Sequence, residues 1–270
     1  MSFEVIDLTE FTGSEVRVGV DELLKPETGK ALRKLLVERG VLVLRGMNLS
    51  DEQQVHLAGN IGDVRDEGKD GVFKVTLDKR ENSRAEYLKG SFLWHMDGTH
   101  DQIPVFASLL SGRKLSQDGG QTMFANSYAA YEALSEEMKR KIDGLRAVHS
   151  LQVSMSRAGV EATEENRTIW SMTPDRTHKL VWKHGNGRKS LVIGCHASHV
   201  EGTDRQEGEA LIQELIEWTT QPRFVYVHEW TPGDLLIWDN TGVLHRVEPY
   251  PLDSGRMMHR TTLLGEEAFA

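Results

Sequence analysis

The stretch Phe92-Leu93-Trp94-His95-Met96-Asp97-Gly98-Thr99 carries the residues around which we expect the chain to fold. If this stretch is a strand, its period of two places the side chains of His95 and Asp97 on the same face. A second histidine from a remote strand, His245, would then complete a set of two imidazoles and one carboxylate. Such a set occupies one face of an octahedral metal ion and leaves the opposite face open, as in non-haem Fe(II) oxygenases.

Each of these three residues also has an ordinary structural interpretation. A histidine such as His95 or His245 can be buried and satisfied by hydrogen bonds, and Asp97 can be a turn residue or a helix cap. A His-X-Asp pair alone is weak support for a metal site in a chain with eleven histidines. The longer pattern is more specific, because an arginine, Arg256, follows His245 eleven positions later.

Composition restricts the class of protein. A chain of 270 residues with 39% hydrophobic and 27% charged residues is typical of a soluble globular protein, and we expect one domain over residues 1–270. The net charge of −9 argues against a nucleic-acid binder, although one local arginine is enough to hold a small anionic substrate. We find no apolar run long enough to span a membrane, no signal peptide at residues 1–7 and a single cysteine, Cys195. These features predict a cytoplasmic protein without an internal disulfide or a membrane segment.

Local patterns predict helices and strands in the first third of the chain. An apolar stripe followed by Gly40 predicts a helix over residues 28–40, and the apolar run 41–44 predicts a buried strand. A capping box at Ser50 predicts a second helix immediately after it. The charged, glycine-bearing segment 62–90 is either a solvated loop or a candidate lid over the substrate.

The rest of the chain continues as short strands with a few helices. We predict strands at 107–110, 121–125, 179–183, 190–193, 224–229, 234–238 and 256–264, helices at 128–134, 135–142 and 204–218, and an irregular region at 154–177. Short strands with turns between them and a few packing helices favour a mostly β protein, a sandwich or jelly roll flanked by helices.

Several motifs together resemble one enzyme family. They are Trp94-His95-Met96-Asp97, Gly119-Gly120-Gln121-Thr122, Ala129-Ala130-Tyr131-Glu132-Ala133-Leu134, Gly233-Asp234-Leu235-Leu236-Ile237-Trp238-Asp239-Asn240 and Leu244-His245-Arg246. This set is similar to the Fe(II)/2-oxoglutarate-dependent dioxygenases of the taurine dioxygenase group. Within that group, the segments 187–189 and 194–202 resemble the dichlorophenoxyacetate dioxygenase branch. The likeness extends from about residue 40 onward.

The resemblance implies a fold and a set of site residues. It implies a double-stranded β-helix (jelly roll) core, His95, Asp97 and His245 as Fe(2+) ligands, and Thr122 and Arg256 as the partners of the distal carboxylate of 2-oxoglutarate. Independently, a guanidinium offers a planar fork of donors that matches a carboxylate, and a threonine hydroxyl adds a neutral contact. Arg256 can otherwise be a surface arginine of a strand, and Thr122 an ordinary strand residue.

Four further residues are candidates for binding the primary substrate. The resemblance implies that Arg260 holds an anionic group of the substrate; we expect a carboxylate, with a sulfonate or sulfate as the alternative anion and a structural salt bridge as the alternative role of Arg260. His196 and His199 match histidines of the dichlorophenoxyacetate branch, with loop packing as the alternative. Asp66 and Ser91 stand roughly where the taurine enzyme has substrate-contacting histidine and asparagine residues, so taurine itself is disfavoured.

We therefore predict an Fe(II)/2-oxoglutarate-dependent dioxygenase that uses O2 to hydroxylate an aliphatic carbon of a small anionic substrate. Hydroxylation beside an ether oxygen, nitrogen or sulfur would cleave the adjacent bond. The resemblance also disfavours halogenation, because halogenating relatives have a small residue where this chain has Asp97. The alternatives are desaturation or cyclisation in a biosynthetic pathway, a non-catalytic metal-binding jelly-roll protein, and a zinc hydrolase. The resemblance also implies a homo-oligomer, a dimer or a tetramer.

Overall fold

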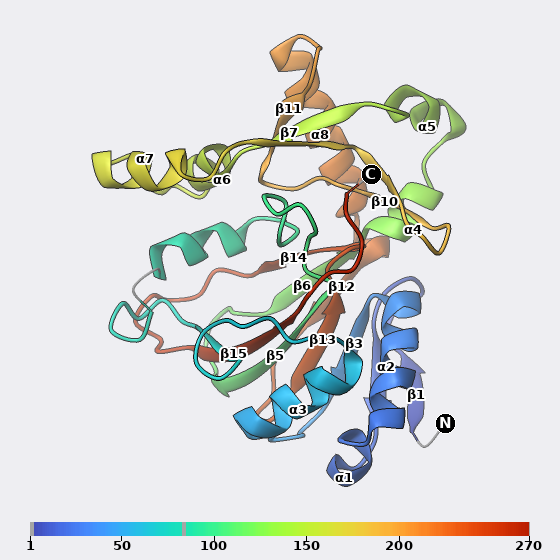
Figure 1. Cartoon of the computed structure of the whole chain (residues 1–270), viewed down its shortest axis with the longest axis vertical. Helices are drawn as coiled ribbons and strands as arrows, with labels where there is room; N and C mark the ends of the chain where they lie inside the picture. Colours follow the sequence, from blue (N-terminus) through green and yellow to red (C-terminus); the bar gives the residue numbers. More distant parts are fainter. Residues whose placement is uncertain (1–2, 83–84, 270) are drawn as a thin grey trace.

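Two β-sheets stacked face to face form the centre of the protein (Figure 1). The computed structural model describes residues 3–82 and 85–269. Within them, the larger sheet contains, in spatial order, β1 (Glu4–Asp7), β2 (Ser14–Arg17), β3 (Val41–Leu44), β13 (Leu235–Asp239), β5 (Ala107–Lys114), β15 (Met257–Leu263) and β4 (Phe73–Val75). The smaller sheet contains β12 (Val225–His228), β6 (Thr122–Asn126) and β14 (Val243–Val247). Neighbouring strands are antiparallel except β2 and β3, which are parallel.

The apolar run of β3 is buried on both faces, as predicted. Val41 and Val43 pack into the cluster between the two sheets, which includes Phe124 of β6. Leu42 and Leu44 point the other way, into a second cluster with the helices outside the larger sheet. The period of two in a strand produces this division, and burial on both faces explains why the run is continuously apolar.

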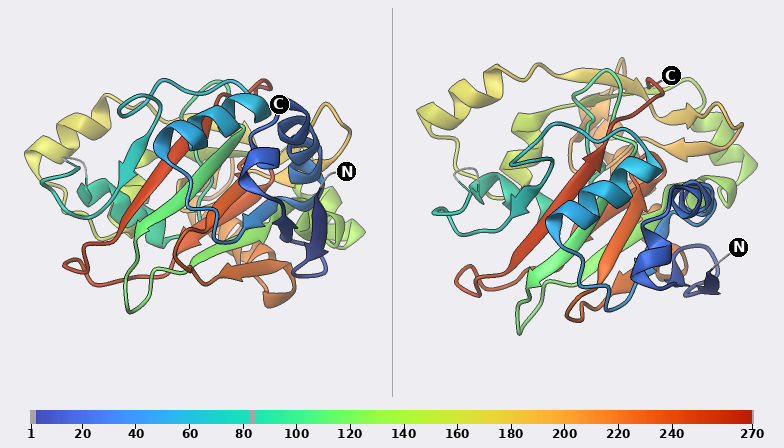
Figure 2. Two further views of the ribbon diagram at one scale, coloured as in Figure 1. Left: turned by 90° about the horizontal axis from the view of Figure 1, so that it is seen from below. Right: turned by 60° about the horizontal axis from the view of Figure 1, so that its bottom comes forward.

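Helices α2 (Pro26–Arg39) and α3 (Asp51–Ile61) pack on the outer face of the larger sheet, and α3 crosses its strands (Figure 2). Gly40 ends α2 with a φ of 74°, a left-handed conformation that glycine adopts without strain. The Ser50 side chain accepts a hydrogen bond from the backbone N–H of Gln53, and the Gln53 side chain accepts one from the backbone N–H of Ser50. The predicted helices and the capping box are therefore confirmed.

The outer face of the smaller sheet is covered by two further sheets and a helix. These elements are β7 (Arg146–His149), β8 (Arg176–Lys179) and β11 (Ala197–Val200) in one sheet, β9 (Val181–Lys183) and β10 (Lys189–Leu191) in the other, and α8 (Arg205–Thr219). Leu244 of β14 packs into the same apolar cluster as Leu215 of α8. The smaller sheet is thus buried on both faces, which fixes the position of β14 and its His245.

The remaining helices are α1 (Val20–Leu23), η1 (Ala85–Phe92, a 3₁₀ helix), α4 (Ser127–Glu132), α5 (Glu136–Ile142), α6 (Leu151–Arg157), α7 (Glu164–Ser171) and η2 (Pro222–Phe224, also 3₁₀). No helix within residues 3–82 and 85–269 has the length and apolar character needed to cross a lipid bilayer. The strand-rich core with flanking helices agrees with the predicted fold class. The extent of the domain, residues 1–270, stays a prediction.

The structure corrects the expected irregular region at 154–177. This region contains the end of α6, all of α7 and the start of β8, and α6 and α7 extend from the body of the molecule (yellow, left in Figure 1). Helix α7 buries only Trp170, which packs with Met155 and Val160. One buried side chain produces no apolar stripe, so periodicity could not reveal this helix.

Three other expectations change in the structure. The predicted strand 179–183 is divided at Leu180 between β8 and β9, which belong to different sheets. His199, whose alternative interpretation was loop packing, lies in strand β11. The segment 62–90 contains β4 and most of η1; Ser83 and Arg84 lie outside the described residues, and a lid function for this segment stays a prediction.

Candidate metal and co-substrate site

His95 and His245 are neighbours because their backbones pair. The N–H of His95 donates to the carbonyl of His245 (3.0 Å), and the N–H of His245 donates to the carbonyl of His95 (2.9 Å). This is an isolated bridge, so the expectation that residues 95–97 lie on a regular strand is wrong. The alternation of faces nevertheless holds: Met96 packs into the apolar cluster with Leu244, while His95 and Asp97 line a cavity.

Asp97 lies in a turn that a buried asparagine holds in place. The N–H of Asp97 donates to the side-chain oxygen of Asn240 (2.9 Å), and the side-chain nitrogen of Asn240 donates to the carbonyls of Asp97 (2.8 Å) and Val105 (3.1 Å). Asn240 follows directly after β13 and is fully buried. These two hydrogen bonds fix the backbone from which the Asp97 carboxylate projects, without using the carboxylate oxygens.

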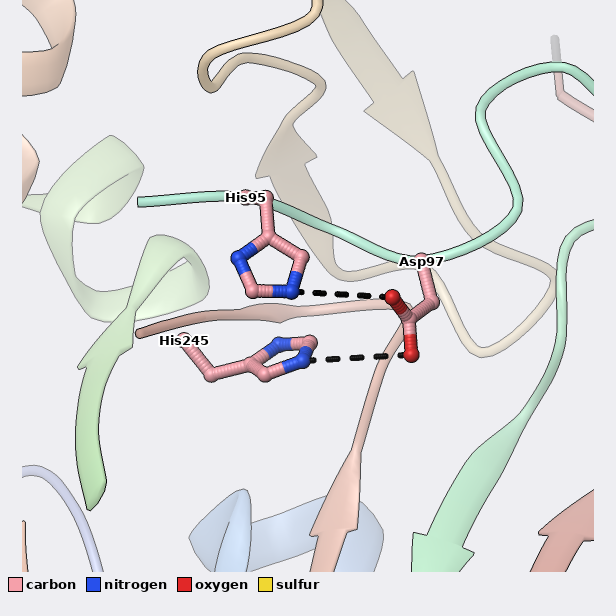
Figure 3. A group of neighbouring side chains, drawn as sticks. All are labelled: His95, Asp97 and His245. Atoms are coloured by element: carbon pink, nitrogen blue, oxygen red, sulfur yellow. Dashed lines mark ion pairs between the residues drawn. The ribbon is translucent and has the colours of Figure 1, made fainter. Parts of the chain in front are cut away.

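The three side chains point toward one another (Figure 3). His95 Nε2 lies 3.6 Å from Asp97 Oδ1, and His245 Nε2 lies 3.8 Å from Asp97 Oδ2. One donor atom from each residue lies within 4.8 Å of the others, and within the described residues no other group of three or more histidines, cysteines or carboxylates does this. The set offers two nitrogens and one carboxylate, which is the donor chemistry of a two-histidine, one-carboxylate metal centre.

Both imidazoles have a nitrogen available for a metal ion. His95 Nδ1 lies 2.8 Å from the carbonyl oxygen of Leu93, so Nδ1 carries the proton and donates it, and Nε2 keeps its lone pair. Burial and the neighbouring His95 lower the pKa of His245 well below its ordinary value, so the ring is neutral. Burial raises the pKa of Asp97, but its neighbours, the Arg260 guanidinium among them, lower it by more, so this carboxyl is ionised.

Thr122 and Arg256 line the same cavity, whose volume is about 210 Å³. Both side chains are buried. The Thr122 hydroxyl accepts a hydrogen bond from the indole N–H of Trp230 (2.9 Å), which leaves its own proton free to donate. The Arg256 guanidinium lies over the ring of Tyr250 and donates to the carbonyl of Gly120 (3.2 Å). The structure therefore brings together the two donors that sequence reasoning assigned to one carboxylate.

Arg260, which lies on strand β15, also lines this cavity. Its Nη1 lies 3.4 Å from Asp97 Oδ2, and its guanidinium lies over the ring of Phe73 on β4. Its Nε is buried and donates to no acceptor within the described part of the chain. A buried N–H without an acceptor is unfavourable, so this nitrogen is available to an oxygen of a bound molecule.

Of the three other residues predicted to bind the substrate, the structure places two in the cavity and one outside it. Ser91 and His196 line the cavity. The Ser91 hydroxyl donates to the carbonyl of Leu88 (2.6 Å), and burial lowers the pKa of His196 to about 4, which keeps this ring neutral. His199 is not among the lining residues; it is half-buried on β11 with its Nδ1 3.0 Å from the Ser198 hydroxyl.

Sequence reasoning missed most of the apolar wall of this cavity. Tyr87 and Leu88 come from η1, and Ser154 and Met155 come from α6. The two elements pack together closely: a Cβ atom added at Gly90 would lie 2.9 Å from the end of Met155. No motif marks these residues, because most of η1 falls in a segment read as a loop or lid and Ser154 and Met155 of α6 fall in a region read as irregular.

Comparison with known proteins agrees with this geometry. The profile of the taurine catabolism dioxygenase TauD, TfdA family matches residues 4–262. The chain is 37% identical to an alpha-ketoglutarate-dependent 2,4-dichlorophenoxyacetate dioxygenase of Cupriavidus pinatubonensis, over 97% of this chain and 93% of the relative. It is 33% identical to the (S)-phenoxypropionate/alpha-ketoglutarate-dioxygenase of Sphingobium herbicidovorans, over 88% of this chain and 86% of the relative.

A solved structure shares the whole fold. The crystal structure of AAD-2 in complex with Mn(II) and N-oxalylglycine superposes with a TM-score of 0.86 and 33% identity, and the match covers 100% of both chains. This neighbour was crystallised with a divalent metal and an analogue of 2-oxoglutarate, and the fold similarity confirms the predicted jelly-roll core. The chain therefore belongs to the taurine catabolism dioxygenase TauD, TfdA family and is an Fe(II)- and 2-oxoglutarate-dependent dioxygenase.

Proposed function

We propose that His95, Asp97 and His245 hold the Fe(2+) of this dioxygenase. The proposal is supported by the convergence of their donor atoms within 4.8 Å and by the free Nε2 of His95. Asn240 would keep the carboxylate in place as the metal enters or leaves, because it holds the main chain of Asp97.

Thr122 and Arg256 would bind the distal carboxylate of 2-oxoglutarate. Buried, charge-assisted hydrogen bonds are the strong ones, and the Arg256 guanidinium is buried. The close approach of Arg256 to residue 120 favours a glycine there, because a Cβ atom at this position would lie 3.1 Å from Arg256 Nε. The Gly119-Gly120-Gln121-Thr122 motif therefore supplies the threonine and also the space for the arginine.

Arg260 would bind the anionic group of the primary substrate, with Ser91 and His196 beside it and the η1–α6 wall around an apolar body. The Nε of Arg260, which is buried and has no hydrogen-bond acceptor within the described residues, is the observation that carries this assignment. The wall side chains Tyr87, Leu88 and Met155 offer mostly apolar surface. Relatives named for dichlorophenoxyacetate and phenoxypropionate support a carboxylate attached to an aryloxy group as the substrate class.

When bound, iron and 2-oxoglutarate supply the oxidising power: O2 and 2-oxoglutarate are converted to succinate and CO2, and one oxygen atom enters a substrate C–H bond. The residues of the chain would bind and orient the two organic molecules. For an aryloxyalkanoate, hydroxylation of the carbon beside the ether oxygen gives a hemiacetal, which breaks into a phenol and a carbonyl compound.

A succinate-release screen tests this proposal. The enzyme would be supplied with Fe(2+), 2-oxoglutarate and O2 and offered aryloxyalkanoates, N-substituted amino acids, sulfonates and alkyl sulfates. We expect substrate-dependent succinate with aryloxyalkanoates, together with release of the phenol. A product that has lost two hydrogen atoms, instead of gaining oxygen, would indicate desaturation or cyclisation. Substrate-dependent succinate with another class alone would contradict the aryloxyalkanoate assignment.

We also propose that the enzyme works in the cytoplasm as a dimer or tetramer. The proposal is supported by the family resemblance and the single cysteine, Cys195, which is buried. Light scattering coupled to size-exclusion chromatography measures the molar mass, for comparison with the 30.4 kDa of one chain.

A further inference from the structure

A second carboxylate faces the proposed substrate arginine. Glu67 Oε1 lies 3.6 Å from Arg260 Nε, the nitrogen that has no hydrogen-bond acceptor within residues 3–82 and 85–269. Glu67 lies in the segment before β4, which is distant in the sequence from the proposed metal ligands. Both side chains are largely buried, with 17% of Glu67 and 24% of Arg260 exposed, so solvent screens this pair only partly.

The position of Glu67 is set by β15, the strand that carries Arg260. The Thr262 hydroxyl donates a hydrogen bond to Glu67 Oε1. The backbone nearby is tied to the same strand: the N–H of Arg65 donates to the carbonyl of Thr262 (2.8 Å), and the N–H of Leu264 donates to the carbonyl of Asp63 (2.8 Å). One hydrogen bond to the carboxylate and two to the backbone shortly before it therefore hold Glu67 beside the strand of Arg260.

Two carboxylates share one guanidinium at this point. Asp97 Oδ2 lies 3.4 Å from Nη1 of Arg260, and Glu67 lies near Nε. A metal ion bound to Asp97 would take up the charge of that carboxylate. Glu67 has no such compensation: among the described residues, Arg260 is the cation found within 4 Å of it. An anion that binds Arg260 therefore meets the negative charge of Glu67 at close range.

We propose that Glu67 is a specificity-determining residue of the substrate site. This inference rests on the proposed role of Arg260. Glu67 shares the guanidinium with the anionic group of the substrate and weakens the binding of anions, most strongly of groups with two negative charges. The site thereby selects singly charged carboxylates over doubly charged groups such as phosphate monoesters, because repulsion between like charges grows with the charge of the ligand.

The substitution Glu67→Gln tests this role with little change in shape. A glutamine can still accept the hydrogen bond from Thr262 but carries no charge. Binding would be measured by calorimetry on the enzyme loaded with Mn(2+) and 2-oxoglutarate, with phenoxyacetate as the single-charge probe and phenyl phosphate as the double-charge probe. We expect the Kd of phenoxyacetate to fall about tenfold in the variant, and that of phenyl phosphate to fall further. The affinity for the keto-acid co-substrate should stay unchanged.

Glu266→Gln is the matched control. Glu266 is exposed and pairs with Arg33, so removing its charge should not change the Kd of either probe. A higher Kd for phenoxyacetate in Glu67→Gln would mean that Glu67 orients Arg260 for the substrate, and would overturn the proposal. Equal Kd values in wild type and variant would also overturn it while leaving the proposed function intact. Failure of both probes to bind either protein would overturn the substrate assignment of Arg260 and this inference together.

Discussion

At the scale of single residues, the proposed function divides the recognition of two anions between two arginines four positions apart. Arg256 contacts Gly120 and Tyr250, whereas Arg260 contacts Asp97 and faces Glu67. Each guanidinium is buried or half-buried, so its hydrogen bonds to a carboxylate are worth roughly 2–3 kcal/mol.

We predict that Arg260→Ala raises the KM for the primary substrate about 30- to 150-fold and leaves the KM for the keto-acid co-substrate unchanged. Arg256→Ala should have the opposite pattern, because its guanidinium is assigned to the co-substrate. Steady-state succinate release with each reactant varied in turn measures both constants. Arg205→Ala, which removes an exposed arginine paired with Glu209, is the control. The same KM changes in both cavity variants would refute the division of roles.

Asp239 makes stability depend on pH. Burial raises its pKa to about 6, although hydrogen bonds from Thr241 and Tyr128 oppose the shift. Because this pKa lies above the ordinary value of 3.8, the folded protein binds more protons than the unfolded chain between about pH 4 and pH 6. The contribution of Asp239 to stability therefore falls as the pH rises through this range, by roughly 3 kcal/mol in all.

Asp239→Asn should remove this dependence. We expect the variant to gain stability relative to wild type as the pH rises from 4 to 7, since an amide does not ionise. Urea unfolding at several pH values measures the difference in the free energy of unfolding. A difference that is constant across this range would show that Asp239 is ionised in the fold at every pH tested.

At the scale of elements, the contact between η1 and α6 forms an apolar wall on the proposed substrate side of the cavity. Gly90 permits the close approach, and Met155, which is buried, fills the space beside it. Neither η1 nor α6 contains one of the proposed metal ligands. No hydrogen bond joins Arg256 to the described residues of these two helices. We therefore expect this wall to determine the size of the substrate and not the chemistry.

Met155→Ala should enlarge this side of the cavity. We predict that the ratio of kcat/KM for naphthyloxyacetate over phenoxyacetate rises ~10-fold, while the KM for the keto-acid co-substrate is unchanged. The variant should also lose about 2–5 kcal/mol of unfolding free energy, because a buried methionine is truncated. Met172→Ala, at a position 70% exposed near the end of α7, should change neither property. An unaltered size preference in Met155→Ala would place the substrate elsewhere in the cavity.

At the scale of the whole molecule, the metal site exists only when distant parts of the chain are folded together. His245 belongs to the smaller sheet, and Asp97 is held by Asn240, which follows a strand of the larger sheet. A metal ion bound by this set therefore stabilises the folded state and not the unfolded chain. At a concentration roughly 100 times the Kd, the gain is about 2.7 kcal/mol.

We predict that Mn(2+) at this concentration raises the Tm by about 5–10 °C, measured by differential scanning fluorimetry without O2. Asp97→Ala should abolish the increase, because it removes the carboxylate of the set. Asp253→Ala, at an exposed position, should retain it. A full increase in Asp97→Ala would show that manganese binds elsewhere.

Much of the fold could be predicted because its signals are local. The caps of α2 and α3 and the double-faced burial of β3 depend on residues close together in the sequence, and all three were confirmed. Helix α7 was missed, since it buries a single residue, Trp170, and so has no apolar stripe. The strand expected at His95 was wrong for another reason: this segment pairs with β14 at one residue only, and sequence periodicity does not reveal how long a pairing continues.

By itself, the sequence predicted the donors through its resemblance to a known family: two histidines and one carboxylate for a metal, and a threonine and two arginines for two anions. It could do so because the chemistry of each side chain is independent of the fold. Only the tertiary structure decided which side chains share the cavity. It excluded His199, added the wall around Met155 and placed Glu67 beside Arg260. Contacts between distant segments depend on strand register and helix packing, which involve the whole chain and leave no local pattern.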